Sequence, residues 1–383
     1  MLGAAACAVW TIVLAVGHGR RLLLNRRLAV RRRHPLPDAP SVPVSLIIPI
    51  KGAFDPDHLG RALAALKGLD GEVVVATENE VEPAYGTVLA LLHRQPDAPL
   101  QVVLSGACPD GLNGKVHNLV VATAAARGEV LLFMDADVLV SARMVREALA
   151  LLEVAGVGAV CAVPYYAAAQ TLGGALVAAY INTRTSPALA RDAARSRLGF
   201  CAGAFYGLTR ATFHRIGGFE PLVRALTDDI YVGRAVVRDG QRIGLLPTPA
   251  VMAPDELPVA QAIRHLGRWY LMGRVFSTRA FRRQLVTAQG PPALLAALLA
   301  WPALGPAALA LPLAIAMYLV AIYRATDWAM LDRPLPFRHQ AMAVLLDFSF
   351  PLLWLHVVAT RRMAWRGRTY LLDHRGEIIG MAH

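Results

Sequence analysis

The feature that most constrains this chain is the stretch from Val130 to Val140, which reads V-L-L-F-M-D-A-D-V-L-V. Its first five residues form a short apolar run of the kind that makes a buried strand. Asp135 and Asp137 follow, and in an extended chain side chains two positions apart point to the same side. Both carboxylates therefore face one point beyond the carboxyl end of the strand, where open α/β sheets bind their ligands.

Two carboxylates that share one point repel each other unless a cation lies between them. Hard divalent ions such as Mg²⁺ or Mn²⁺ bind such oxygen ligands and bridge to phosphate oxygens. Asp135 and Asp137 are therefore candidate metal ligands of a diphosphate site. A short D-x-D pattern also occurs in loops where the first aspartate caps a following helix, so the interpretation depends on the rest of the chain.

Strand and helix patterns alternate on both sides of this stretch. Apolar runs predict strands at residues 44–50, 73–76, 102–105, 130–135, 157–163, 200–209 and 243–247. Helical patterns lie at residues 57–66, 81–93, 115–126, 142–154, 171–183 and 222–239. This alternation predicts an α/β catalytic domain over residues 43–255, with a parallel sheet and crossover helices.

The two ends of the 383-residue chain are more apolar than its middle. Residues 2–16 are apolar and arginines follow them, which is the reverse of the charge order in a signal peptide. Residues 1–34 are therefore predicted to be a signal anchor with a basic interfacial segment. Residues 256–290 interleave arginines with aromatic residues at helical spacing, which indicates amphipathic helices in the plane of the headgroups.

Residues 291–360 are predicted to be a transmembrane region. Its first apolar stretch, Pro291 to Tyr323, is longer than one straight span needs and contains prolines, so either a kinked helix or a tight hairpin fits. A further span is predicted at residues 341–360. Arginines after residue 16 and in a basic tail at 361–383 place the catalytic domain and the tail in the cytoplasm, with three spans preferred and four for a hairpin.

The formal net charge of +12 comes almost entirely from arginine. No nucleic-acid-binding motif accompanies it, so we assign the arginines beside the apolar segments to a lipid bilayer with anionic headgroups and expect no nucleic-acid partner. The four cysteines (Cys7, Cys108, Cys161 and Cys201) show neither zinc-site nor disulfide spacing, which favours a reducing compartment.

Other motifs occur in order around D-A-D. They are P-I-K-G at 49–52, A-T-E-N-E at 76–80, G-L-N-G-K-V-H-N-L at 111–119, L-T-D-D-I-Y-V-G at 226–233 and H-L-G-R-W at 265–269. Taken together, the chain resembles the family-two glycosyltransferases, and most closely the ceramide glucosyltransferases, almost from end to end. The resemblance implies a nucleotide-sugar-binding, Rossmann-like domain of the GT-A type with N- and C-terminal transmembrane helices.

The resemblance also implies which residues bind the donor. Lys51 belongs to the first motif, and Glu78 stands where the family usually has an aspartate that contacts the uracil or ribose of UDP. Lys115 lies at a helix start, where its charge and the helix dipole can neutralise a diphosphate, and Asn118 is a supporting residue. Asp135 is expected to contact the donor as well as the metal.

The last motif departs from the family pattern, which is glutamine or arginine, two residues, and then Arg-Trp. Arg268 and Trp269 match, whereas His265 occupies the first position. The resemblance implies that Arg268 steadies the diphosphate and that Trp269 stacks near the acceptor or the sugar. His265 is retained as a supporting residue whose role the sequence leaves open.

The paired acids Asp228 and Asp229 match the family segment whose second acid is the catalytic base, so Asp229 is the candidate base. Inverting transfer attacks the anomeric carbon from the face opposite the leaving UDP, and a carboxylate must take the proton of the acceptor hydroxyl. Asp228 is expected to cap the helix or to orient its neighbour. Capping and dipole stabilisation would also explain both acids without any catalytic role.

The sequence thus predicts a membrane-bound inverting glycosyltransferase that moves a hexose, by resemblance glucose, from a UDP-sugar to a lipid hydroxyl, by resemblance that of ceramide. A hopanoid, a carotenoid or another membrane lipid stays open as acceptor, as does UDP-N-acetylglucosamine as donor. A processive polysaccharide synthase fits less well, because such synthases usually carry Q-x-x-R-W and more spans. A non-catalytic lipid- or nucleotide-binding relative would have no reason to retain the acids and Arg268 together.

Overall fold

A computed structural model describes residues 2–32, 35, 41–109, 112–222, 227–276, 281–282, 287–358, 362–365, 368–372 and 378–382. The predicted motifs and segments extend beyond these residues at 33–34, Gly111, 223–226, 277–280, 283–286, 359–360 and in parts of the basic tail. The chain forms two compact units. Val30–Tyr165 and Leu189–Ala253 make the sheet unit, and Met1–Ala29, Tyr166–Ala188 and Pro254–His383 make the helical unit. The expected catalytic domain at 43–255 includes Tyr166–Ala188, whereas the structure assigns these residues to the helical unit.

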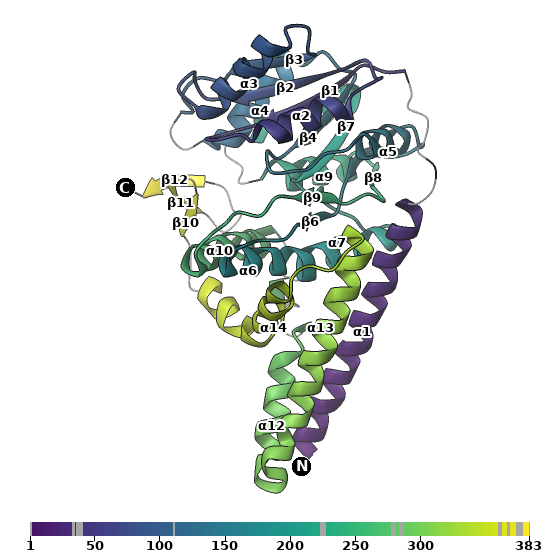
Figure 1. Cartoon of the computed structure of the whole chain (residues 1–383), viewed down its shortest axis with the longest axis vertical. Helices are drawn as coiled ribbons and strands as arrows, with labels where there is room; N and C mark the ends of the chain where they lie inside the picture. The colour runs from purple at the N-terminus through teal and green to yellow at the C-terminus, as the bar shows by residue number, and fades with distance from the viewer. Residues whose placement is uncertain are drawn as a thin grey trace. The chain divides into compact units, whose positions relative to one another are not determined.

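A seven-stranded sheet organises the sheet unit, with strand order β3-β2-β1-β4-β7-β5-β8 (Figure 1). The strands are β1 (Val44–Pro49), β2 (Gly71–Thr77), β3 (Leu100–Leu104), β4 (Val130–Met134), β5 (Val157–Cys161), β7 (Phe205–Thr209) and β8 (Arg242–Leu245). Neighbours pair in parallel except at β7, which is antiparallel to both β4 and β5. The predicted parallel sheet is therefore mostly parallel. Between β6 (Pro164–Tyr166) and β7 the chain passes through the helical unit, so no single crossover helix sets the direction of β7.

Helices join the strands as the sequence predicts, namely α2 (Pro56–Ala65), α3 (Pro83–Arg94), α4 (Gly114–Ala125) and α5 (Ala142–Leu152). Asp55, Asn113 and Ser141 cap α2, α4 and α5 through side-chain oxygens that accept from backbone N–H groups. The central strands β1, β2 and β4 are buried nearly throughout, which is typical of a sheet covered on both faces. The carboxyl ends of these strands are thereby held as a rigid edge.

Two predicted elements near the paired acids are shorter than expected. The strand expected at 200–209 begins only at Phe205, and the helix expected at 222–239 is α9 (Asp228–Arg238), after a short 3₁₀ helix at Glu220–Leu222. Residues 201–202 are irregular and 203–204 form a turn, and the chain at Phe200 and Cys201 lies so close to α9 that a Cβ at Gly233 would overlap its backbone. Tertiary packing of small residues thus overrides the local strand pattern.

The chain after D-A-D is fixed by β9 (Ala250–Met252), a strand that the sequence did not predict. Val138 forms an isolated bridge with Met252, and the backbone N–H of Ala253 donates to the carbonyl of Asp137 at 2.8 Å. The loop that carries the candidate metal ligands is therefore anchored on its far side. A further short helix, α8 (Arg210–Arg215), follows β7.

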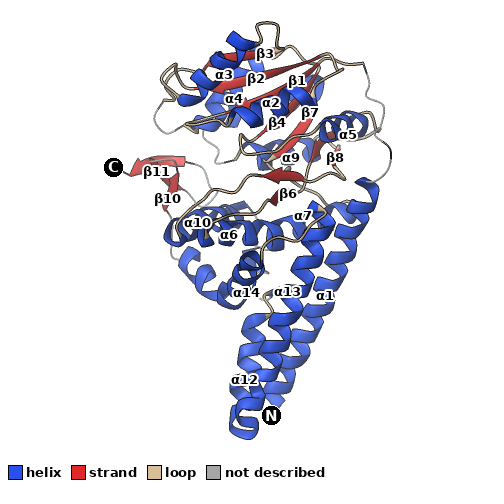
Figure 2. Cartoon of the chain, in the orientation of Figure 1, coloured by secondary structure: helices blue, strands red, loops and turns tan. Residues whose placement is uncertain are grey.

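The helical unit contains α1 (Leu2–Arg32), α6 (Leu172–Tyr180), the π-helix η1 (Ile181–Thr185), the start of α7 (Ser186–Ala194), α10 (Val259–Phe276), α12 (Gly290–Leu304), α13 (Ala310–Leu331) and α14 (Phe337–Val358). Figure 2 shows this part of the chain as almost wholly helical. Helix α1 is continuous, so the predicted anchor and its basic segment are one helix. The amide of Gln289 donates to the carbonyl of Leu14, and the hydroxyl of Tyr318 donates to that of Ala15, which fastens α1 to the α12–α13 pair.

The long apolar stretch predicted at 291–323 forms a hairpin, which is one of the two expected forms. The chain leaves α12 at Gly305, whose φ of +52° lies in the left-handed region, and Pro306 follows within a 3₁₀ helix at Gly305–Leu309. Helices α12 and α13 then lie side by side (Figure 1). Gly290–Leu331 and Phe337–Val358 are apolar enough and long enough to cross a membrane, and Leu2–Gly17 is a shorter apolar helix.

The outer surface of these helices carries large exposed apolar side chains, including Leu298, Leu313, Met317 and Leu352. Such exposure is typical of helices that face lipid and is rare on a soluble monomer. The described part of the predicted basic tail forms a three-stranded antiparallel sheet, which the sequence did not predict, from β10 (Arg362–Trp365), β11 (Arg368–Leu372) and β12 (Ile378–Ala382).

Candidate active site

Three motifs that are far apart in the sequence meet at the carboxyl edge of β4. The ammonium of Lys115, from the first turn of α4, lies 2.8 Å from Asp135 Oδ1 and 3.2 Å from Asp228 Oδ1. Burial opposes the charge of Lys115, but the carboxylates of Asp135, Asp228 and Asp229 outweigh it and hold the pKa of Lys115 above its ordinary value. Lys115 therefore bridges the metal candidate Asp135 to the helix that carries the candidate base.

The two adjacent acids of α9 have different surroundings. Asp228 is 3% exposed, and its carboxylate accepts from the hydroxyl of Tyr206 at 2.7 Å while it also binds Lys115. The helix cap is Thr227 rather than Asp228, so the capping explanation fails for Asp228. Helix capping does not explain Asp135 either, because Ser141 caps α5, the helix that follows Asp135. Tyr206 was missed by sequence reasoning, although a tyrosine inside an apolar strand signals a buried hydroxyl that needs a partner.

Asp229 has the properties of a general base. Burial and the neighbouring charge of Asp228 raise the pKa of Asp229 to about 7, even though Lys115 and the N–H of Ile230 act in the opposite direction. A Cβ at Gly203 would lie 2.9 Å from Asp229 Oδ2, so only glycine leaves that carboxylate its place. A carboxylate whose pKa lies near neutrality can accept a proton and release it again at physiological pH.

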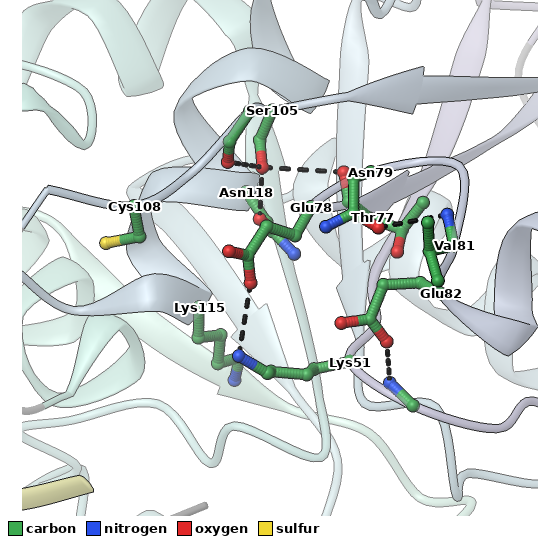
Figure 3. A network of polar contacts seen from close by, with 12 residues as sticks. Lys51, Thr77, Glu78, Asn79, Val81, Glu82, Ser105, Cys108, Lys115 and Asn118 are labelled. Atoms are coloured by element: carbon green, nitrogen blue, oxygen red, sulfur yellow. Dashed lines mark hydrogen bonds and ion pairs between the residues drawn. The ribbon is translucent and has the colours of Figure 1, made fainter.

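A second group of predicted residues lies where β1 and β2 end (Figure 3). The ammonium of Lys51 is 3.1 Å from Glu78 Oε2, so the longer acid at this position is held by an ion pair. Asn118 donates to the carbonyls of Ile50 at 3.2 Å and Ala76 at 3.4 Å, and it accepts from Ser105 at 2.7 Å. Asn118 thereby ties together the ends of β1, β2 and β3.

Two further side chains support these loops and were not predicted. Glu82 accepts from the N–H of Gly52 at 2.7 Å, which fixes the turn after β1 where Gly52 has a φ of +90°. Nδ1 of His58 lies 3.0 Å from the carbonyl of Ala136, the middle residue of D-A-D, and must donate because a carbonyl only accepts. His58 therefore holds the loop between the two candidate metal ligands.

The H-L-G-R-W residues lie on α10, in the helical unit. Arg268 lies with Nη2 3.0 Å from Nε2 of His265, and since a guanidinium only donates, Nε2 must accept. Burial and the charge of Arg268 lower the pKa of His265 to about 3, which agrees with a neutral ring. The same ring packs edge-on against Trp269 with centroids 4.3 Å apart. His265 thus orients both Arg268 and Trp269, which is a role for the position that the sequence left open.

The oxygen donors of Asp135 and Asp137 suit a hard divalent cation. Among the residues that the structure describes, no three His, Cys, Asp or Glu side chains converge on one point. Mg²⁺ commonly binds through one or two carboxylates and completes its shell with waters and substrate phosphates. The chemistry of the two carboxylates therefore fits a metal that is shared between the protein and a diphosphate.

A sequence model described as glycosyl transferase family 21 matches residues 6–378. This chain belongs to glycosyl transferase family 21. The membership confirms the resemblance carried by the motifs. Ceramide glucosyltransferase 1 of Caenorhabditis elegans is 22% identical over 254 residues, which is 62% of this chain and 52% of that protein. The match thus spans about half the length of this curated relative.

Two solved glycosyltransferase structures align with parts of the family 21 chain. A mannosyltransferase from Pyrobaculum calidifontis, in complex with GDP-Man and Mn²⁺, aligns with a TM-score of 0.51 and 19% identity, covering 89% of this chain and 98% of that one. A glucosyl-3-phosphoglycerate synthase from Mycobacterium tuberculosis, in complex with Mn²⁺, UDP and glucosyl-3-phosphoglycerate, aligns with a TM-score of 0.39 and 14% identity, covering 62% of this chain and 80% of that one. The first likeness supports the predicted GT-A-type α/β fold.

Proposed function

We propose that this family 21 protein is a membrane-bound inverting glycosyltransferase that transfers glucose from UDP-glucose to the hydroxyl of ceramide. The observation that carries the proposal is the adjacent pair Asp228 and Asp229, in which one acid is buried and held by Tyr206 and Lys115 and the other has a pKa of about 7. Family membership supports transfer from a nucleotide sugar, and the nematode relative supports the lipid acceptor.

In the proposed reaction, Asp229 takes the proton of the acceptor hydroxyl while that oxygen attacks the anomeric carbon. The bond between this carbon and the diphosphate oxygen breaks, UDP leaves with the electron pair, and the product is a β-glycoside. Asp228, which is bound by Tyr206 and Lys115, supplies the negative field that raises the pKa of its neighbour. Asp135 and Asp137 would hold a divalent metal, which would neutralise charge on the departing diphosphate.

The remaining predicted residues are assigned to donor and acceptor. Lys51 and Glu78 lie at the ends of β1 and β2, where a nucleotide base and ribose bind in open α/β sheets, and Asn118 holds that edge in shape. Arg268 is proposed to steady the diphosphate, and Trp269 is proposed to stack on the sugar or the acceptor.

We further propose three membrane spans, α1, α12 and α13, with the sheet unit and the C-terminal tail in the cytoplasm. Helix α12 has 15 residues, about 22 Å, and lies antiparallel to the apolar part of α1, since Leu299 meets Gly3 and Gln289 meets Leu14. Arginines follow the apolar part of α1, so the apolar layer ends close to Leu14. Gln289 contacts Leu14 and therefore lies at the same edge. Helix α14 starts from that edge and packs on α6 and α10, which makes it an interfacial helix in this proposal.

The proposal is tested with the purified protein in lipid nanodiscs, supplied with a panel of UDP-sugars, a panel of lipid acceptors and Mg²⁺ or Mn²⁺. Mass spectrometry identifies the product, and NMR of the anomeric proton gives its configuration. We expect β-glucosylceramide from UDP-glucose. An α-linked product would contradict the inverting mechanism, and glycosylation of a hopanoid or another lipid in place of ceramide would contradict the acceptor assignment.

A further inference from the structure

A buried ion pair in the helical unit takes no part in the chemistry proposed above. Arg184 Nη2 lies 2.7 Å from Asp347 Oδ2, and the two side chains are 6% and 1% exposed. The other carboxylate oxygen of Asp347 accepts from the backbone N–H groups of Gln289 at 2.7 Å and Gly290 at 2.8 Å. Desolvating two charges is costly and often contributes little net stability, so a buried pair of this kind calls for a reason other than stability.

The helix around Arg184 is unusual. Residues Ile181–Thr185 form a π-helix between α6 and α7, and Ser186 donates its hydroxyl to the carbonyl of Ile181 at 2.8 Å. Short π segments are rare and occur frequently at functional sites. The ion pair therefore connects three elements: this π segment, α14, and the first residues of α12.

From the ion pair, a continuous set of aromatic rings leads to the Arg-Trp motif. The guanidinium of Arg184 lies over the ring of Phe350, 4.6 Å from its centroid. Phe350 packs against Tyr270 with centroids 5.2 Å apart, and Tyr270 packs against Tyr180 at 4.7 Å. Tyr180 stacks on Trp269, with centroids 5.9 Å apart and ring planes 23° apart.

The middle of this set is held by packing alone. The hydroxyl of Tyr270 is buried and has no hydrogen-bond partner among the described residues. The position of Tyr270 thus depends on the rings of Phe350 and Tyr180 on either side of it, and Phe350 in turn lies beneath the guanidinium that Asp347 fixes. Close-packed interiors transmit displacements of this kind because they have few voids to absorb them.

We infer that Arg184 and Asp347 are positioning residues for acceptor recognition, which they serve by fixing the orientation of Trp269 through Phe350, Tyr270 and Tyr180. The inference rests on the proposed function, in which Trp269 contacts the acceptor or the sugar. The ion pair touches no reacting group itself. Its contribution is preorganisation, since a binding side chain is useful only when its own neighbours hold it in place.

The test replaces the pair in two ways. Asp347→Asn keeps an oxygen for the N–H groups of Gln289 and Gly290 but leaves Arg184 without its counter-charge, and such a variant can fail to fold. The double variant Arg184→Met with Asp347→Asn removes both charges at similar volume. Asp327→Asn is the matched control, because Asp327 is another buried carboxylate of this unit, bound to Gln340 and the N–H of Leu335, and lies outside the aromatic set.

Each variant is assayed for the KM of the lipid acceptor, the KM of UDP-glucose and acceptor-independent hydrolysis of UDP-glucose. Small misplacements of a binding group can cost up to about 100-fold, so we expect the acceptor KM of the double variant to rise roughly 10- to 100-fold. We expect the other two quantities, and every quantity in the control, to stay within about threefold. In a Trp269→Ala background, removal of the ion pair should raise the acceptor KM no further.

Two results would overturn the inference. One is a parallel loss of acceptor use and donor hydrolysis in the double variant, which a general structural role would produce. The other is a full additional effect of the ion pair in the Trp269→Ala background. If the parent protein glycosylates a lipid other than ceramide, the same comparison is made with that lipid, so the acceptor assignment and the positioning role fail independently.

Discussion

Replacement of Asp229 by asparagine separates the catalytic use of this carboxylate from its cost to the fold. The amide keeps the size of the side chain and much of its hydrogen bonding but cannot accept a proton from the acceptor hydroxyl. General-base contributions are typically about 10²–10⁴-fold, so we expect turnover to fall by roughly that factor. UDP affinity should change little, since Lys51, Glu78 and Lys115 are untouched.

The same substitution should stabilise the protein at alkaline pH. The pKa of Asp229 is raised from 3.8 to about 7 in the folded state, so the stability that this proton contributes is fully present below about pH 4 and is lost as the pH rises through 7. A difference of about three pH units corresponds to roughly 4 kcal/mol at 1.4 kcal/mol each, as an upper bound for a half-buried and interacting acid. Asparagine carries no charge at any pH, so the variant does not lose this stability as the pH rises through 7.

The assay measures the thermal midpoint of Asp229→Asn and of the parent protein in detergent at pH 5 and pH 8. Excess chelator is present, because a bound cation would itself lower the pKa of Asp229. We expect a clearly higher midpoint for the variant at pH 8 and a much smaller difference at pH 5. Asp228→Asn is the contrast, since it weakens the bonds to Tyr206 and Lys115 and should lower the midpoint at both pH values with a milder loss of turnover.

The reasoning about the pair would be refuted in either of two ways. A lower midpoint of Asp229→Asn at pH 8 would mean that the carboxylate is stabilised by the fold and has no raised pKa. Loss of turnover in Asp228→Asn, with turnover kept in Asp229→Asn, would mean that the assignment within the pair is reversed.

Four further predictions concern the metal, the donor edge, the Arg-Trp motif and the topology. Asp137→Ala should abolish turnover and leave the circular dichroism spectrum unchanged, and full activity of the parent in excess chelator would contradict the metal site. Asn118→Ala should weaken UDP binding and lower stability by about 1–3 kcal/mol, because it removes the side-chain donor to the buried carbonyl of Ile50; equal UDP affinity in titration calorimetry would count against this role. His265→Gln restores the family residue but removes the ring beside Trp269, so the acceptor KM should rise while donor affinity holds, and an unchanged acceptor KM would refute it. A reporter fused after His383 should lie in the cytoplasm, and a lumenal or periplasmic reporter would reverse the proposed topology.

Local pattern was sufficient for the alternation of strands and helices, for the position of D-A-D at the end of β4, and for the apolar segments at both ends. These features depend on periodicity and capping, which are properties of neighbouring residues and can be read along the chain. The order of the motifs around D-A-D was likewise enough to indicate the family, because every motif except H-L-G-R-W occupies a strand end or a helix start of one sheet.

Tertiary structure decided what distinguishes Asp228 from Asp229. Their sequence surroundings are nearly identical, and the difference comes from Tyr206 on an antiparallel strand, from Lys115 on α4 and from the close approach of Gly203. Tertiary structure likewise decided the pairing of Arg184 with Asp347 and the hairpin between α12 and α13. A pKa depends on burial and on charges brought in from distant parts of the chain, and a buried ion pair depends on helices that meet only after folding, so neither leaves a local trace in the sequence.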